Sequence, residues 1–372
     1  MSVPDKKVAI VFDWITGTGG AERVIYELHK IFPDAPIYTS TNEAPKNSQF
    51  KNADIRTAWF QKLPKILRKY KLLTIPRYIY FSRLKLREYD VVISAGSAES
   101  KAVKVVDGVH INLCYTPTLY YWIKPEEYLN SKGTGGLNPV WKLGLRILTP
   151  LMKKLDYKAA QNPDTIYAIS TAVQERIKQH YHRDSKLLYP PVDTERFHND
   201  NQQRDGFVIF GRQVEHKRMD LAIAACNELR KKLVVMGDGP EHERLKAMAG
   251  PTIEFVTNVS DEKIVTYVSQ AEAFIFPNEE DFGIVALESQ AAGTPIIAYR
   301  KGGSLDTVIE GVTGEFFDDQ TVSSLCKTLK TFNHRIYNTK AMIENADKFS
   351  ISEFQKQIEK AFQDIHDDGT LS

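Results

Sequence analysis

The chain has 372 residues, of which 42% are hydrophobic and 26% are charged, and its formal net charge is +2. This length exceeds one typical core and the composition is that of an ordinary globular protein, so we expect two domains. No long apolar run is present, and we therefore expect neither a membrane-spanning helix nor a secretory leader. The three scattered cysteines predict no disulfide framework and no metal site, which favours a reducing cytoplasm.

Charge is distributed unevenly along the chain. Residues 1–190 carry 29 Lys and Arg against 17 Asp and Glu, a balance of +12. Residues 191–372 carry 20 against 30, a balance of −10. Such asymmetry between two halves indicates two bodies with different partners.

Short apolar runs alternate with helical patterns in the first half, which is typical of an α/β protein with a parallel sheet. Residues 8–12, VAIVF, form a continuous apolar run, as expected of a central parallel strand. A Gly-rich turn at 17–20 follows, and then an amphipathic helix. We expect further strands at residues 37–39, 91–94, 111–115 and 165–169.

The pattern is interrupted at residues 189–193, YPPVD, because consecutive prolines disfavour a helix. It then restarts, with strands expected at 207–210, 232–236, 253–256, 274–276 and 295–298 and helices at 219–230, 241–248, 261–269 and 284–292. We therefore predict domains at residues 1–190 and 191–348. A final segment, 349–372, contains a helix that we expect to cross back to the first domain.

The segment 277–288, PNEEDFGIVALE, joins a predicted strand to a predicted helix. Its loop contains Gly283 and lies between two carboxylates, Glu280 and Glu288. The N-terminus of a helix favours an anion, and carboxylates accept hydrogen bonds from hydroxyl groups. This arrangement fits a ligand with a phosphate in the middle and hydroxyls at both ends, which describes a nucleotide sugar.

The loop 211–217, GRQVEHK, follows the first predicted strand of the second domain. Ligands bind at strand ends in open α/β sheets, and Arg212 and Lys217 together could neutralise a diphosphate. Cations near the start of a helix are locally unfavourable, so their placement favours a bound anion. In the first domain, Gly19 and Gly20 permit close approach of the backbone to a ligand, with a purely structural turn as the alternative.

These motifs resemble those of the retaining family-4 glycosyltransferases, and residues 114–122, CYTPTLYYW, resemble the polysaccharide and O-antigen type mannosyltransferases of that family. The resemblance implies the GT-B fold, in which two Rossmann-like domains with parallel sheets face each other across a cleft. It implies that Glu280, Arg212 and Lys217 are catalytic. The implied donor-binding residues are Gly19, Gly20, Tyr115, Arg212, Lys217, Glu280, Asp281, Phe282, Gly283, Ile284 and Glu288.

The resemblance also implies a role for each part of the motif. Glu280 and the amides of residues 282–284 would hold the donor sugar, Glu288 the ribose, and Arg212 and Lys217 the diphosphate. It implies transfer on one face of the sugar without a covalent intermediate, so we assign no nucleophile. The histidines have no ligand-like partners at a recognisable spacing, so we expect no metal site, and we expect no cofactor. GDP-mannose is the favoured donor, and the expected acceptor is a saccharide or a lipid-linked saccharide.

Three positions depart from the family pattern. Tyr115 stands where the family usually has His, Ile123 where Asp often follows Trp, and Arg218 where Gly usually follows the lysine. The departures at Tyr115 and Ile123 leave three possibilities open: a different donor, slower chemistry, or an enzyme that no longer turns over. Two alternative functions therefore remain, a non-catalytic protein that binds a nucleotide sugar and a transferase of the same fold that uses a UDP-sugar.

Residues 59–87 contain nine Lys and Arg and no Asp or Glu, interleaved with apolar and aromatic residues. This composition is typical of an element that binds an anionic membrane surface, but a helix packed on its own domain shows the same pattern. No motif for nucleic-acid binding accompanies it. We therefore predict a cytoplasmic protein, peripheral at the inner face of the membrane, with no nucleic-acid partner.

Overall fold

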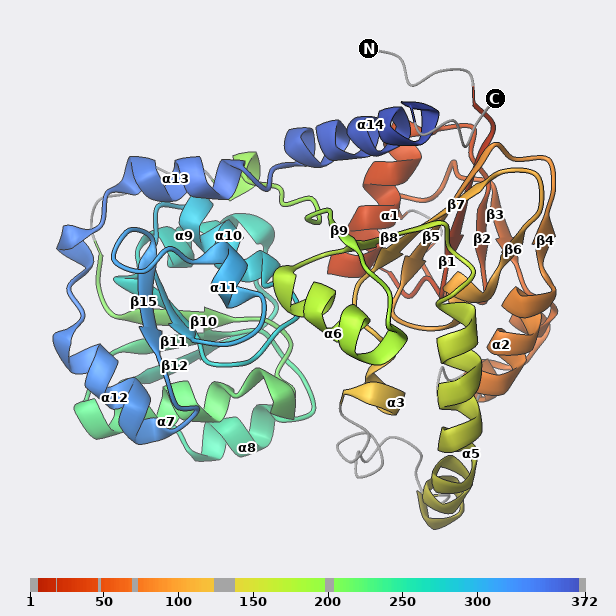
Figure 1. Ribbon diagram of the computed structural model, residues 1–372. Coiled ribbons are helices and arrows are strands. Elements are labelled where there is room, and N and C mark those ends of the chain that lie inside the picture. Colours follow the sequence, from red (N-terminus) through yellow and green to blue (C-terminus); the bar gives the residue numbers. More distant parts are fainter. Residues whose placement is uncertain are drawn as a thin grey trace. The chain divides into compact units, whose positions relative to one another are not determined.

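The computed structural model describes residues 6–17, 19–45, 48–68, 73–123, 138–197 and 204–367. The chain divides into two units. Unit 1 is Met1–Pro190 with Gln355–Ser372, and unit 2 is Pro191–Phe354. Each unit is built around a parallel sheet flanked by helices (Figure 1), which confirms the predicted α/β class with two Rossmann-like domains.

Unit 1 contains a seven-stranded sheet in the order β3-β2-β1-β5-β7-β8-β9, with every pairing parallel. The strands are β1 (Val8–Phe12), β2 (Ile37–Thr39), β3 (Ile55–Thr57), β5 (Val91–Gly96), β7 (Val109–Cys114), β8 (Thr165–Ala168) and β9 (Lys186–Leu187). Every residue of β1 is buried, as the apolar run predicts. The edge strands β3 and β9, and the separate pair β4 (Lys85–Leu86) and β6 (Lys104–Val105), were missed because they are short and partly polar.

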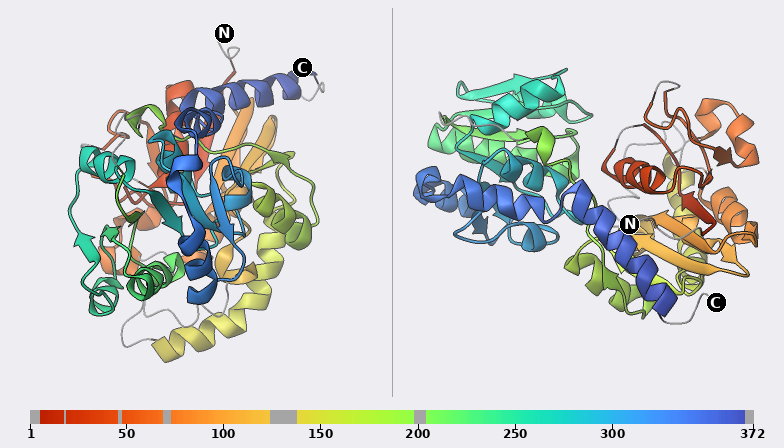
Figure 2. Two further views of the ribbon diagram at one scale, coloured as in Figure 1. Left: turned by 90° about the vertical axis from the view of Figure 1, so that its left-hand side faces the viewer. Right: turned by 90° about the horizontal axis from the view of Figure 1, so that it is seen from above.

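The helices of unit 1 are α1 (Gly20–Ile31), α2 (Thr74–Arg83), α3 (Leu119–Trp122), α5 (Asn138–Ala159) and α6 (Thr171–Tyr181), together with most of α14 (Ile351–Asp367). Helix α14 lies beside α1 (Figures 1 and 2). Between the two helices the ring of Phe362 stacks on that of Phe32, with 5.0 Å between centroids. Helix α6 begins after Ser170, whose hydroxyl accepts a hydrogen bond from the amide of Val173. Among the residues described here, no helix is both long and apolar enough to span a bilayer.

Unit 2 contains a six-stranded parallel sheet in the order β12-β11-β10-β13-β14-β15. Its strands are β10 (Phe207–Phe210), β11 (Leu233–Met236), β12 (Ile253–Val256), β13 (Ala273–Phe276), β14 (Ile296–Tyr299) and β15 (Gly314–Phe317). Its helices are α7 (Met219–Leu229), α8 (His242–Ala247), α9 (Asp261–Ser269), α10 (Ile284–Ala291), α11 (Ser304–Thr307), α12 (Val322–Thr331) and α13 (Thr339–Asp347). Helices α7 and α12 pack together on one face of the sheet and α10 and α13 on the other (Figure 1).

Each sheet has one point where the order of its strands reverses. In unit 1 the reversal lies between β1 and β5, and in unit 2 between β10 and β13. The loops that leave two such neighbouring strands run in opposite directions, and ligands bind between them in proteins of this class. In unit 2 these are the loops 211–217 and 277–283, which contain most of the predicted donor-binding residues.

Candidate functional site

The two loops at the reversal point of unit 2 bring a cation and a carboxylate together. Lys217 ends the short 3-10 helix Glu215–Lys217 after β10, and its Nζ forms an ion pair with Oε1 of Glu280, in the loop after β13. Their side chains are 22% and 19% exposed, so both remain reachable from solvent. Burial lowers the pKa of Lys217 to about 8, while the adjacent carboxylate favours the charged form.

The loop that contains Lys217 is fastened to the next loop of unit 2 by Gln213, which is fully buried. The backbone amide of Gln213 donates to the carbonyl of Asp238 at 2.9 Å, and its own carbonyl accepts from the amide of Glu241 at 3.1 Å. Its side-chain amide donates to the carbonyl of Gly237 at 2.8 Å. A loop held at both backbone and side chain can position Lys217 reproducibly.

Arg218 has a φ of 49° and a ψ of 35°, the left-handed conformation that glycine adopts most readily. Its guanidinium donates to Oδ1 of Asp220 at 3.2 Å and to Oε1 of Gln320 at 3.0 Å. Gln320 in turn donates to the carbonyl of Pro277 at 2.9 Å. Arg218 therefore keeps the turn expected of glycine and links the two loops of the reversal point through Gln320. Gln320 could not be predicted as this partner, because it lies before α12, about a hundred residues further along the chain.

The loop after β13 is held just as closely. Gly283 has a φ of 97° at the start of α10, and a Cβ there would lie 3.0 Å from the ring of Phe276. Phe282 is buried and its ring packs against that of Phe349, with 5.6 Å between centroids. The carbonyl of Glu280 accepts from the amide of Gly303 at 2.8 Å. The loop backbone is thus fixed on both sides of the point where α10 begins.

The other predicted site residues of unit 2 differ in their exposure to solvent. Arg212 is exposed on the loop that contains Lys217, whereas Glu288 is buried within α10. Asp281 and Ile284 are half-buried. The structure thus brings Lys217 and Glu280 together directly and places Arg212 on the same loop.

In unit 1, Gly19 and Gly20 lie at the start of α1. A Cβ at Gly19 would lie 2.6 Å from Oε2 of Glu22, so the carboxylate of Glu22 would have to move to admit a side chain there. Tyr115 follows β7, and its hydroxyl donates to the carbonyl of Ala21 at 3.1 Å. Burial raises the pKa of Tyr115 well above its ordinary value, so the phenol stays protonated. In this structure the hydroxyl anchors the first turn of α1 beside the glycine pair.

The reversal point of unit 1 is occupied by Asp13, which sequence reasoning missed. Its carboxylate accepts hydrogen bonds from the amides of Ser97 and Ala98, at 2.9 and 2.8 Å, and from that of Ser100 at 2.8 Å. Asp13 thereby orders the turn after β5. Its position directly after the apolar run of β1 was the only signal in the sequence.

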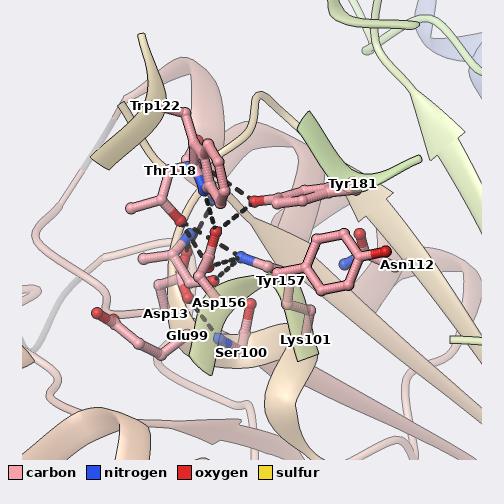
Figure 3. Close-up of polar contacts among 12 residues, drawn as sticks. Asp13, Glu99, Ser100, Lys101, Asn112, Thr118, Trp122, Asp156, Tyr157 and Tyr181 are labelled. Carbon is pink, nitrogen blue, oxygen red and sulfur yellow. Dashed lines mark hydrogen bonds and ion pairs between the residues drawn. The ribbon is translucent and has the colours of Figure 1, made fainter. Parts of the chain in front are cut away.

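A second missed element is a buried polar cluster centred on Asp156 of α5 (Figure 3). Lys101 forms an ion pair with it, with 2.6 Å between Nζ and Oδ1, and both side chains are 5% exposed. Burial lowers the pKa of Lys101, but the charge and the hydrogen bond of Asp156, together with the nearby Cys114 and Asp13, outweigh this effect and the net shift is upward. The carboxylate also accepts from Thr118, Trp122 and Tyr181 at 2.9, 2.7 and 2.7 Å. The cluster therefore holds in place the segment that follows Tyr115.

The basic and apolar stretch 59–87 divides between core and surface. Arg77 is 1% exposed and forms an ion pair with Glu99, with 2.8 Å between Nε and Oε2, so this cation is not available to an outside partner. Phe60 and Phe81 are fully buried. In contrast, Trp59 is 69% exposed and Ile79 is 42% exposed. Packing on its own domain therefore accounts for part of this stretch, and membrane binding by its exposed residues stays a prediction.

Residues 192–349, most of unit 2, match the model of the family described as "Glycosyl transferases group 1". The chain is similar to a GDP-mannose-dependent alpha-(1-6)-phosphatidylinositol monomannoside mannosyltransferase of Mycolicibacterium smegmatis, with 28% identity over 210 residues, 48% of this chain and 55% of that protein. It is also similar to the sulfoquinovosyl transferase SQD2 of Arabidopsis thaliana, with 26% identity over 208 residues, 53% of this chain and 41% of that protein. The chain thus aligns with about half the length of such relatives.

Solved structures resemble the whole chain. A sucrose-phosphate synthase from Thermosynechococcus elongatus superposes with a TM-score of 0.74 at 15% identity, covering 97% of this chain and 99% of that one. HepE from Anabaena, in complex with UDP and glucose, superposes with a TM-score of 0.67 at 14% identity, covering 96% and 99%. At such identities the likeness concerns the fold, and it agrees with the expected pair of Rossmann-like domains.

Proposed function

We propose that this chain is a family-4 glycosyltransferase with the GT-B fold and that it transfers a hexose from a nucleotide sugar to a saccharide acceptor. The match of residues 192–349 to the glycosyl transferases group 1 and the likeness of the fold to solved glycosyltransferases support this. We propose mannose as the hexose and GDP-mannose as the donor, with retention of configuration and without a metal or other cofactor. The mycobacterial relatives, whose names state dependence on GDP-mannose, support this donor.

The observation that carries the proposal is the contact between Lys217 and Glu280 at the reversal point of unit 2. An ammonium close to the start of a helix attracts a phosphate, and a carboxylate beside it accepts hydrogen bonds from sugar hydroxyls. We propose that Lys217 and Arg212 bind the diphosphate. Glu280 and the amides of Phe282, Gly283 and Ile284 would hold the hexose, and Glu288 the ribose.

In the proposed reaction, a hydroxyl of the acceptor forms a bond to the anomeric carbon while the bond from that carbon to the diphosphate oxygen breaks. The hydroxyl proton passes to the leaving diphosphate, on whose oxygen negative charge develops. Lys217 and Arg212 stabilise that charge electrostatically. The acceptor enters on the face from which the diphosphate leaves, so no side chain of the protein is assigned as a nucleophile.

The direct test incubates the protein with GDP-mannose and candidate acceptors and follows the release of GDP. We expect release that depends on the acceptor, survives EDTA, and yields a product whose anomeric configuration matches that of the donor by NMR. Tight binding without release, for every acceptor tried, would instead support a non-catalytic nucleotide-sugar binding protein. Such a role would fit the replacement of the family His by Tyr115.

The nucleobase needs its own test, because similar folds have been solved with UDP and with UDP-glucose. A ligand that binds only the folded protein raises its melting temperature. We expect GDP to produce a larger thermal shift than UDP at equal concentration. A larger shift with UDP would overturn GDP-mannose as the donor and favour a UDP-sugar-dependent transferase.

We further propose that the protein is cytoplasmic and meets its acceptor at an anionic membrane surface through part of residues 59–87. Trp59, Ile75 and Ile79 expose apolar surface, while Lys65 and Arg83 on the same stretch are exposed cations. Apolar side chains and cations together favour binding to anionic lipid. Co-sedimentation with anionic liposomes at low salt tests this. If the protein stays in the supernatant, or if Trp59→Ser and Ile79→Ser leave binding unchanged, the membrane proposal is wrong.

A further inference from the structure

Asn278 is the most unusual buried polar residue near the proposed donor site. It lies two residues after the end of β13 and is 2% exposed. Within the described part of the chain, its Nδ2 has no hydrogen-bond partner. A buried amide without an acceptor destabilises the fold, and native proteins contain few such groups. We therefore expect the Nδ2 group of Asn278 to donate a hydrogen bond to an acceptor from outside the chain.

The surroundings of Asn278 indicate what that acceptor is. Asn278 lines a small pocket together with Lys217, and Val285 in the first turn of α10 lines the same pocket. An amide donor, an ammonium and the start of a helix each favour a negatively charged oxygen. The remaining lining residues are apolar, among them Phe210 and Met219, and offer no side-chain acceptor to the amide.

We propose that Asn278 is a donor-binding residue whose Nδ2 donates a hydrogen bond to an oxygen of the diphosphate that Lys217 binds. This inference rests on the proposed function and adds to it a residue that the sequence motifs did not single out. The Nδ2 group, which has no acceptor in the free protein, then acquires one when the diphosphate binds. Its cost to folding is offset when the phosphate is bound.

The test combines binding with stability, because the two move in opposite directions only under this proposal. Asn278→Leu replaces the amide by an apolar side chain with the same branching and number of heavy atoms, and Asn278→Asp replaces the donor by a negatively charged acceptor. The affinities for GDP and for GDP-mannose and the melting temperature of the ligand-free protein are measured for both variants and the wild type. UDP replaces GDP as the probe if the wild type binds it more tightly.

For Asn278→Leu we expect a higher melting temperature without ligand and an affinity for GDP lowered about tenfold to a hundredfold, as for loss of a hydrogen bond to a charged group. For Asn278→Asp we expect a larger loss of affinity, because the carboxylate repels the phosphate. Asn345→Leu is the matched control. Asn345 is 5% exposed, but its Nδ2 donates to Gln290 at 2.8 Å and to Thr307 at 3.0 Å. That variant should lose stability and keep the affinity of its folded fraction for GDP.

Three results would overturn the inference. If both Asn278 variants bind GDP as tightly as the wild type, the amide does not contact the diphosphate, although the proposed function stands. If GDP binding is unchanged and only GDP-mannose binds more weakly, the amide contacts the hexose and the phosphate assignment is wrong. If the wild type binds neither nucleotide, the proposed function fails first and this inference fails with it.

Discussion

Replacing Lys217 with methionine removes the ammonium but keeps an unbranched side chain. A hydrogen bond to a charged group contributes about 1.5–3 kcal/mol, so we expect donor affinity to fall roughly tenfold to 150-fold. The ion pair with Glu280 is partly exposed, with side chains 22% and 19% accessible. Because such pairs contribute about 1 kcal/mol or less to folding, the melting temperature should change little.

Isothermal titration with GDP-mannose measures the loss of affinity, and Lys301→Met provides the control. Lys301 forms an ion pair with Glu279 of the same acidic loop, with 3.2 Å between Nζ and Oε2, but its side chain is 58% exposed. This variant should bind GDP-mannose as the wild type does. Equal affinity in Lys217→Met and wild type, or an equal loss in Lys301→Met, would refute the assignment of Lys217 to the diphosphate.

Three further outcomes follow from the structure. Because the pKa of Lys217 is lowered to about 8, the affinity for GDP-mannose should fall as the pH rises above that value, by up to about tenfold per pH unit. The fall should be less steep in Lys217→Arg, and identical pH profiles for the two proteins would contradict this prediction. Gly283→Ala should lower the free energy of unfolding by about 1–2 kcal/mol or more. The loss should exceed that of Gly311→Ala, whose added Cβ meets no atom within 4 Å, and equal losses would contradict the contact with Phe276. Asp156→Ala leaves Lys101 buried without its partner and should cost about 3–5 kcal/mol in urea unfolding. The control Asp184→Ala breaks an exposed pair and should cost under about 1 kcal/mol; similar costs would contradict a structural role for the Asp156 cluster.

The sequence was most informative where apolar runs meet loops at strand ends. Strands β1, β10 and β13 are fully or largely buried runs, and each was expected within a residue or so of its observed bounds. Since carboxyl ends of parallel strands share one edge, the loops after β10 and β13 could be expected to adjoin. The structure places Lys217 against Glu280 on those two loops.

The remainder depends on contacts between residues that are distant in sequence. Nothing around Lys101 indicates that it pairs with Asp156 in the long helix α5, because either charge alone is typical of an exposed surface. Likewise, Arg77 belongs to a stretch of sequence that is rich in Lys and Arg. Only the folded structure distinguishes it as the buried partner of Glu99. The short edge strand β15 has too few apolar residues to produce a clear pattern.

Unit 1 is assembled from both ends of the polypeptide, and this affects how the protein should respond to cleavage. Residues 355–372 return to unit 1, where Phe362 stacks on Phe32 and the side chain of Gln357 accepts from the amide of Tyr189 at 2.9 Å. A single protease cut between residues 190 and 191 would sever one of two covalent links. The fragments should then elute together under native conditions and separate only when denatured.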